Sequence, residues 1–250
     1  MGWRAADGGV NPAPPIRDAA TVVIVRDAAT DPRVLVGQRG KGAAFMPSKF
    51  VFPGGAVDAA DAAIRLAEPP SAATLAALGQ EAAIDPTAVL AAAVREVWEE
   101  TGLAFARPDP SARADAASAA SASWARFLGA GLRPSAAGFT FFFRAITPPG
   151  RPRRFDARFF LVDADRALGD LDDFSGAEDE LANLHWVRLD EMRRLDVPFI
   201  TEVALAEVAA RLGGAAPSGV PFFDNSGTPP RFLRLAVSGD EDERGDRDGQ

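Results

Sequence analysis

Residues 95–103 read Arg-Glu-Val-Trp-Glu-Glu-Thr-Gly-Leu, and this stretch indicates both a helix and a chemistry. Helix residues turn by about 100° each, so Glu99 falls roughly 60° to one side of Glu96 and Glu100 roughly 40° to the other. All three carboxylates therefore project from one face. The apolar residues of the same helix fall near the opposite side, at Leu90, Val94 and Val97. The stretch predicts an amphipathic helix over residues 87–101 that ends at Gly102.

Three glutamates at this spacing favour a site for divalent cations. Like charges three and four residues apart repel by a few tenths of a kcal/mol per pair, and a bound cation would turn that repulsion into attraction. Upstream, residues 52–55 read Phe-Pro-Gly-Gly, where glycines permit a backbone approach that a Cβ would block. A backbone carbonyl of this turn is then free as a fourth oxygen ligand. The alternative interpretation is the solvated face of a surface helix.

The composition limits the other classes of function. The 250 residues include no cysteine and one histidine, His185, which excludes thiolate metal sites and disulfides. A metal would be held by oxygen, which favours magnesium, manganese or calcium. With a net charge of −8, the chain lacks the excess of positive charge that is typical of a nucleic-acid-binding protein. No apolar run is long enough for a membrane span and no leader is recognisable, so we expect a cytoplasmic protein with no membrane partner.

The order of expected elements favours an α/β fold in which helices pack against a mixed sheet. Short strands are predicted at residues 21–26, 33–39, 49–52, 139–146, 155–163 and 184–188, with the fourth and fifth joined in a hairpin. Besides the glutamate helix, helices are predicted at residues 74–78, 124–128, 190–194 and 199–212. We expect a flexible arm over 1–18, one domain over 19–237, and a disordered acidic tail over 238–250.

The chain resembles the Nudix hydrolases at these motifs. Their signature is G-x5-E-x7-R-E-U-x-E-E-x-G-U, where U is apolar; Gly55 matches its first glycine, and residues 95–103 match its second half without a departure. The resemblance implies an α/β/α sandwich around a mixed sheet. It also implies that Glu96, Glu99 and Glu100 bind Mg²⁺ or Mn²⁺ together with the Gly55 carbonyl, and that Arg95 orients these carboxylates.

The first acid of the signature is the one departure. Asp61 has the right spacing from Gly55 but is not glutamate, and Thr87 has the right spacing from Arg95 but carries no charge. An insertion at about residues 59–86 therefore splits the motif, and we expect the loss of the first glutamate to shift the geometry of the site without abolishing its chemistry.

The split motif, with the surrounding residues 44–55 and 153–161, resembles the Nudix branch that has a long interrupted box and includes coenzyme A diphosphatases. That resemblance implies hydrolysis of the pyrophosphate bond in a nucleoside diphosphate linked to another group, with coenzyme A or acyl-CoA as substrate. An ADP-ribose, dinucleotide or nucleotide-sugar pyrophosphatase is the alternative enzyme. A non-catalytic nucleotide-binding regulatory domain is the alternative of a different class. The expected partner is a small nucleotide, and the sequence does not decide whether the chain forms a homodimer.

Several further residues are candidates for the site. Glu180, in an acidic loop, is a candidate general base, with a solvated loop as the alternative. Arg153 and Arg154 are candidates for a phosphate clamp, with a solvated hairpin turn as the alternative. Arg39, at the end of a strand, is a second candidate for phosphate contact. His185 and Trp186 are expected to be packing residues. The aromatic run at 139–143 is expected to belong to the core, with a base-stacking platform as the alternative.

Overall fold

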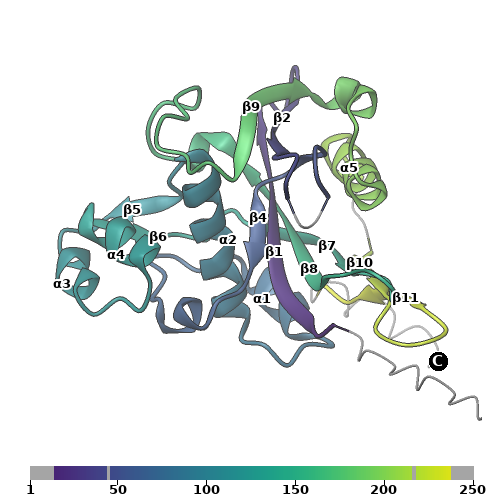
Figure 1. Cartoon of the computed structure of the whole chain (residues 1–250), viewed down its shortest axis with the longest axis horizontal. Coiled ribbons are helices and arrows are strands. Elements are labelled where there is room, and N and C mark those ends of the chain that lie inside the picture. Colours follow the sequence, from purple (N-terminus) through teal and green to yellow (C-terminus); the bar gives the residue numbers. More distant parts are fainter. Residues whose placement is uncertain (1–13, 44–45, 216–217, 238–250) are drawn as a thin grey trace, which may run out of the picture.

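The computed structural model describes residues 14–43, 46–215 and 218–237 (Figure 1). The predicted acidic tail and the first 13 positions of the predicted arm lie outside these residues, as do Ala44 and Phe45. Strand pairing begins within the last residues of the predicted arm, where Ile16 pairs with Arg154. The bounds of the domain stay a prediction.

A mixed sheet forms the centre of the described part of the chain. Its strands follow the order β11-β10-β7-β8-β1-β2-β3, with β4 paired to β1 and β9 paired to β2. Strand β1 runs parallel to β8, and β10 runs parallel to β7, while the other pairs are antiparallel. The strands are β1 (Ile16–Arg26), β2 (Arg33–Arg39), β3 (Phe50–Val51), β4 (Gly54–Ala56), β7 (Thr140–Ile146), β8 (Arg154–Asp163), β9 (Leu181–Arg188), β10 (Val220–Asp224) and β11 (Arg231–Leu235).

Helices cover both faces of this sheet. Helix α2 lies on one face and α5 on the other, and α3 and α4 lie beyond α2 together with a small second sheet (Figure 1). The α-helices are α1 (Ala72–Gly79), α2 (Pro86–Thr101), α3 (Ala112–Ala116), α4 (Ala122–Gly129) and α5 (Phe199–Leu212). Short 3-10 helices are η1 (Ala59–Ala63), η2 (Ala164–Arg166) and η3 (Leu189–Arg194), and the small sheet pairs β5 (Ala106–Pro108) with β6 (Leu132–Pro134).

The two cores follow from the alternation of side chains along the strands. Successive strand residues point to opposite faces, so Val22 and Ile24 of β1 enter the core under α2, while Val23 and Val25 enter the core under α5. This arrangement confirms the predicted α/β fold with a mixed sheet between helices. Among the described residues, no helix is both long and apolar enough to span a membrane.

Helix α2 forms where its sequence predicts it. The Asp85 carboxylate accepts a hydrogen bond from the Thr87 amide at 2.8 Å and caps the N-terminus, where Pro86 occupies the first turn. Gly102 ends the helix in the left-handed conformation with φ of 78°. Leu90 and Val94 are fully buried, so the apolar face packs as expected.

Most other predictions are confirmed, with some omissions. The predicted hairpin is the antiparallel pair β7–β8, and the aromatic run at 139–143 is buried. Trp186 is half-buried against the core, and His185, although exposed, packs in a T-shaped arrangement with the ring of Phe50. The sequence pattern did not predict β4, β5, β6, α3, β10 or β11. Such short elements carry little periodicity and depend on the partners that tertiary folding provides.

Candidate active site

The three glutamates of α2 are less exposed than their helix face predicts. Glu96 is 8% exposed and Glu100 is 2% exposed, whereas Glu99 is half-buried. The reason is β4, which lies against this face of the helix: the Gly54 amide donates a hydrogen bond of 2.7 Å to Glu100 Oε2. The glutamates therefore lie in a partly closed site between a helix and a strand.

Both positions of β4 that carry glycine require it, because neighbouring atoms lie where a Cβ would be. A Cβ on Gly55 would lie 2.4 Å from each carboxylate oxygen of Glu96. A Cβ on Gly54, whose φ is 155°, would lie 2.3 Å from the carbonyl oxygen of Ala20 on β1. The predicted backbone approach at this turn is thus confirmed. The Gly55 carbonyl as a metal ligand stays a prediction.

Arg95 connects two of the glutamates to the turn. Its Nη1 donates to Glu96 Oε1 and to Glu99 Oε2, both at 2.8 Å, and its Nη2 donates to the Ala56 carbonyl at 2.9 Å. Burial opposes the charge of this guanidinium, but the hydrogen bond to Asp61 and the surrounding carboxylates outweigh burial and raise the pKa of Arg95. Arg95 therefore stays cationic and fixes the orientation of both glutamates.

The acid opposite Arg95 is Asp61, which comes from the insertion. Its carboxylate is fully buried and accepts hydrogen bonds from Arg95 Nε and Nη2, both at 2.9 Å. The Asp58 amide and the Trp124 indole also donate to it, each at 2.8 Å. Asp61 reaches Arg95 because η1 lies against α2. The expected effect of an aspartate in place of the first glutamate stays a prediction. Sequence spacing suggested Asp61, but nothing in the sequence pointed to Trp124.

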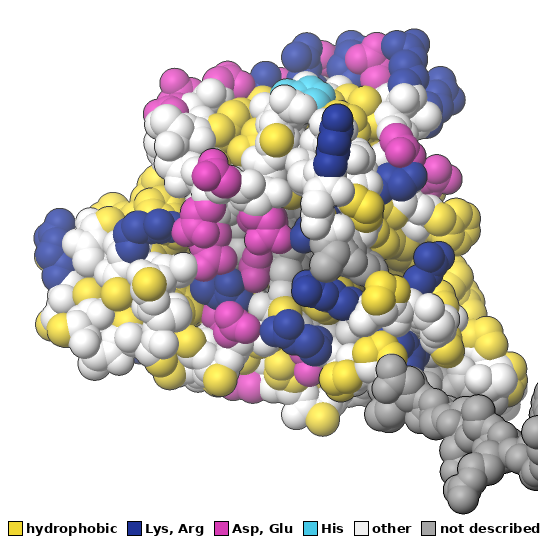
Figure 2. Space-filling view, in the orientation of Figure 1, with side chains coloured by type: hydrophobic (Ala, Val, Ile, Leu, Met, Phe, Trp, Pro, Cys, Tyr) yellow, Lys and Arg dark blue, Asp and Glu magenta, His cyan; other side chains and the backbone are white. Residues whose placement is uncertain are grey.

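Two charged residues from other elements lie near the glutamates. Arg39 at the end of β2 donates from Nη2 to Glu180 Oε1 at 2.8 Å, and the Glu180 side chain is 56% exposed. The negative charge of Glu180 contributes to raising the pKa of both Glu96 and Glu100. The structure thus brings both candidates to the site, and Figure 2 shows acidic side chains gathered over α2 with basic ones beside them.

The two hairpin arginines have different surroundings. Arg153 is exposed, whereas Arg154 is buried and donates to the carbonyls of Thr147 at 3.0 Å and Asn225 at 2.7 Å. Arg154 therefore holds the hairpin against the loop after β10. A role for either residue in binding substrate stays a prediction.

A buried ionic network next to β4 escaped sequence reasoning. Arg158 is 1% exposed and lies opposite Ala20, the residue that also pairs with Gly55. Its Nη1 donates to Asp18 at 2.7 Å, and its Nη2 lies 3.4 Å from Asp156. The available signal was the charge at alternate positions 154, 156 and 158, since residues two apart share one face of a strand.

Two comparisons with known proteins found proteins similar to this chain. No family model matches the chain. A Nudix hydrolase crystal structure from Alicyclobacillus acidocaldarius is 30% identical, covers 79% of this chain and 92% of its own, and superposes with a TM-score of 0.59. The chain belongs to the Nudix hydrolase family. A Caenorhabditis elegans protein named "Putative nudix hydrolase 7" is 32% identical over 187 residues, which are 70% of this chain. The chain spans about half, 52%, of the length of that Nudix relative.

The charge of the glutamates is the central electrostatic property of this Nudix site. Burial, reinforced by the charges of Glu99 and Glu180, raises the pKa of Glu96 to about 7 despite the nearby Arg95. Burial and the charge of Glu96 raise the pKa of Glu100 well above its ordinary value, although the Gly54 hydrogen bond opposes the shift. The protein alone therefore does not fully compensate the negative charge of Glu96 and Glu100.

The residues fit a divalent cation by their chemistry. Glu100 Oε1 is buried without a hydrogen-bond partner in the described part of the chain, and carboxylate oxygens are the ligands that hard cations prefer. Within residues 14–43, 46–215 and 218–237, no three acidic side chains are already arranged around one point. Arg95 Nη1 donates to both Glu96 and Glu99.

Proposed function

We propose that this Nudix protein hydrolyses a pyrophosphate bond in a nucleoside diphosphate linked to another group, with Mg²⁺ or Mn²⁺ as cofactor. The observation that carries the proposal is the pair of buried carboxylates, Glu96 and Glu100, held against the Gly54–Gly55 turn with one oxygen of Glu100 unpartnered. A buried negative charge that its hydrogen-bond donors compensate only in part is costly and is typical of a functional site.

Each residue has a role in this proposal. Glu96, Glu99, Glu100 and the Gly55 carbonyl would hold the cation, which when bound would neutralise phosphate oxygens and acidify a water molecule. Arg95 orients Glu96 and Glu99 through its two hydrogen bonds of 2.8 Å.

Glu180 on the acidic loop would take part in proton transfer, and Arg39 on β2 would bind phosphate. Glu180 is half-exposed beside the glutamates and would accept the proton of the attacking water. Arg39, which holds Glu180, would contact a phosphate oxygen of the substrate. Because the two side chains bind each other, a phosphate that recruits Arg39 would also free the Glu180 carboxylate for this proton.

Coenzyme A or acyl-CoA is the substrate that we propose within this class. The support is the resemblance of the interrupted motif to the branch that includes coenzyme A diphosphatases. Arg153, exposed on the β7–β8 hairpin, is the proposed contact for an additional phosphate, and Arg154 holds that hairpin in place.

A substrate panel tests the proposal. The purified protein would be incubated with coenzyme A, acetyl-CoA, ADP-ribose, a dinucleotide and a nucleotide sugar, each with Mn²⁺, with Mg²⁺ and with EDTA. We expect metal-dependent conversion of coenzyme A to 3′,5′-ADP and phosphopantetheine. Turnover of ADP-ribose but not of coenzyme A would overturn the substrate assignment. Nucleotide binding without any turnover would indicate the regulatory alternative.

A further inference from the structure

Trp124 is bound directly to the acid that fixes Arg95. This tryptophan lies on α4 and is fully buried, and its indole Nε1 donates to Asp61 Oδ1 at 2.8 Å. The same oxygen accepts the hydrogen bond from Arg95 Nε at 2.9 Å. One carboxylate oxygen therefore joins α4, which lies outside the signature motif, to the arginine at the beginning of its second half.

We propose that Trp124 is a positioning residue of the metal site. Through Asp61 and Arg95 it would set the orientation of Glu96 and Glu99, and this inference rests on the proposed function. A residue that orients the ligands without touching them can govern metal affinity, since changes in such outer partners commonly cost about 10- to 100-fold in affinity or activity.

The hydrogen-bond geometry explains why one indole can matter. An ionised carboxylate offers about four acceptor sites, and Asp61 accepts from Arg95 Nε, Arg95 Nη2, Trp124 Nε1 and the Asp58 amide. Its orientation is therefore fully determined. Loss of the indole N–H leaves one site of a buried charge unfilled, and the carboxylate then turns to share the donors that remain.

A rotation of Asp61 would reach the glutamates by a short route. The guanidinium of Arg95 is rigid and planar, with Nε and Nη2 on Asp61 and Nη1 on Glu96 and Glu99. A movement of the edge that carries Nε and Nη2 consequently moves Nη1 as well. Because all these groups are largely buried, bulk water does not replace a lost hydrogen bond.

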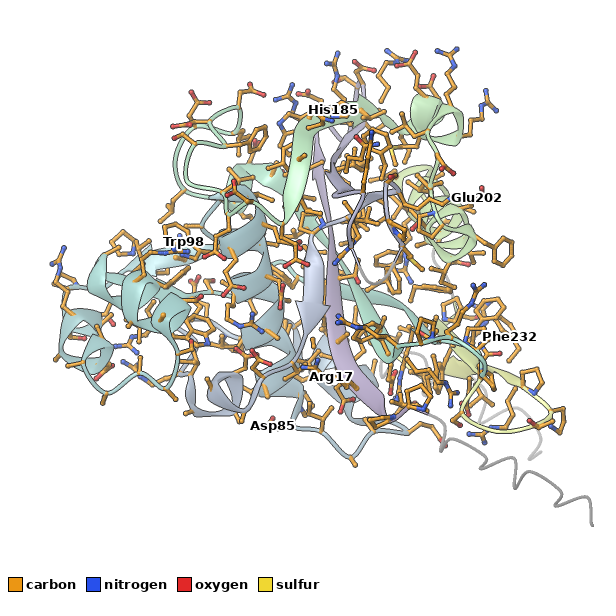
Figure 3. All side chains as sticks on the ribbon, viewed as in Figure 1. Arg17, Asp85, Trp98, His185, Glu202 and Phe232 are labelled. Carbon is orange, nitrogen blue, oxygen red and sulfur yellow. The ribbon has the colours of Figure 1, made fainter. Side chains whose placement is uncertain are left out.

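The chain contains a matched control for this interaction. Trp98 on α2 and Trp124 both pack edge-on against Phe127, with ring centroids 5.2 Å and 5.5 Å away. Figure 3 shows Trp98 on the side of α2 that faces α4. Its indole Nε1 is buried but has no hydrogen-bond partner in the described ranges. Replacing Trp98 by phenylalanine removes the same atoms from the same aromatic cluster without removing a hydrogen bond.

The experiment compares Trp124→Phe with Trp98→Phe in the full chain. Mn²⁺ affinity would be measured by isothermal titration calorimetry without substrate, and kcat and KM would be measured on the best substrate of the panel. We expect Trp124→Phe to weaken Mn²⁺ binding about tenfold and to lower kcat by a similar factor with little change in KM. We expect Trp98→Phe to change each quantity by less than about twofold.

Two outcomes separate this inference from the proposed function. If the wild-type protein binds Mn²⁺ and both tryptophan variants bind it equally well, the positioning role is overturned and the proposed function stands. If the wild-type protein binds no Mn²⁺, both the positioning role of Trp124 and the proposed function are overturned. Should Trp124→Phe fail to fold, Asp61→Glu gives a second test, because it keeps the charge but shifts the carboxylate by one methylene. Wild-type Mn²⁺ affinity in Asp61→Glu would also overturn the inference.

Discussion

Arg95 and Asp61 form a buried, two-pronged ion pair across 34 positions of sequence, with Nε on Oδ1 and Nη2 on Oδ2, both at 2.9 Å. This pair ties the insertion to the glutamate helix. It also explains how a split motif retains an ordered site. The insertion supplies this aspartate from a 3-10 helix that lies beside α2.

Removing the charge of Asp61 is expected to destabilise the protein. Asp61→Asn leaves the buried guanidinium of Arg95 without its fully buried counter-ion, and breaking a buried pair in this way costs about 3–5 kcal/mol. Urea denaturation in the presence of EDTA measures the free energy of unfolding. Asp58→Asn is the control, because that carboxylate is 58% exposed and lies 4.0 Å from Arg95 Nη2. Equal stability of the two variants would contradict the importance of the pair.

The glutamates are expected to matter for chemistry more than for stability. Glu99→Gln or Glu100→Gln should lower turnover at least about a hundredfold, since each removes a proposed ligand of the metal. Glu100→Gln should not lower the free energy of unfolding of the metal-free protein, because it replaces a buried carboxylate by a neutral group of the same shape. Steady-state kinetics and urea denaturation measure the two effects. Wild-type activity in both variants would refute the proposed site.

Gly55→Ala is expected to damage metal binding while preserving the fold. The added Cβ would lie 2.4 Å from the oxygens of Glu96, which are the end of a flexible side chain and can move away. We expect a loss of stability of no more than about 1 kcal/mol and at least about a tenfold loss of Mn²⁺ affinity. Gly79→Ala is the control, since nothing lies within 4 Å of its added Cβ. Unchanged Mn²⁺ affinity in Gly55→Ala would argue against Glu96 as a ligand.

The stability of the metal-free protein is expected to fall as the pH rises from about 5 to about 7. The folded-state pKa of Glu96 is about 7, above its ordinary value of 4.5, so the folded protein binds this proton more tightly than the unfolded chain. Stability from this group is therefore fully present below the ordinary pKa and lost as the pH rises through about 7, with a slope of at most about 1.4 kcal/mol per pH unit.

Urea denaturation in EDTA across that pH range measures the slope. Glu96→Gln is the control and should show a shallower dependence, because the titrating group is gone. The raised pKa of Glu100 acts in the same direction, so some slope should remain. A wild-type stability that rises over this range would show that the glutamates are better compensated than the structure indicates.

Local sequence was sufficient where the responsible forces are local. The helix around Glu96 is specified by its cap at Asp85, its stop at Gly102 and its apolar face, all within one segment. The same applies to the β7–β8 hairpin, whose alternation and turn lie in adjacent residues. Missed elements such as β10 depend on distant partners, since Phe222 of β10 pairs with Arg144 of β7.

The sequence by itself determined that Glu96, Glu99 and Glu100 share one face, because their spacing fixes that face on any helix. Only the tertiary structure decided how they are surrounded. Burial of two of them under β4 raises their pKa values, and the folding of the insertion brings Asp61 and Trp124 to Arg95. Those effects arise from contacts between residues that are far apart in the chain, which no local pattern of sequence encodes.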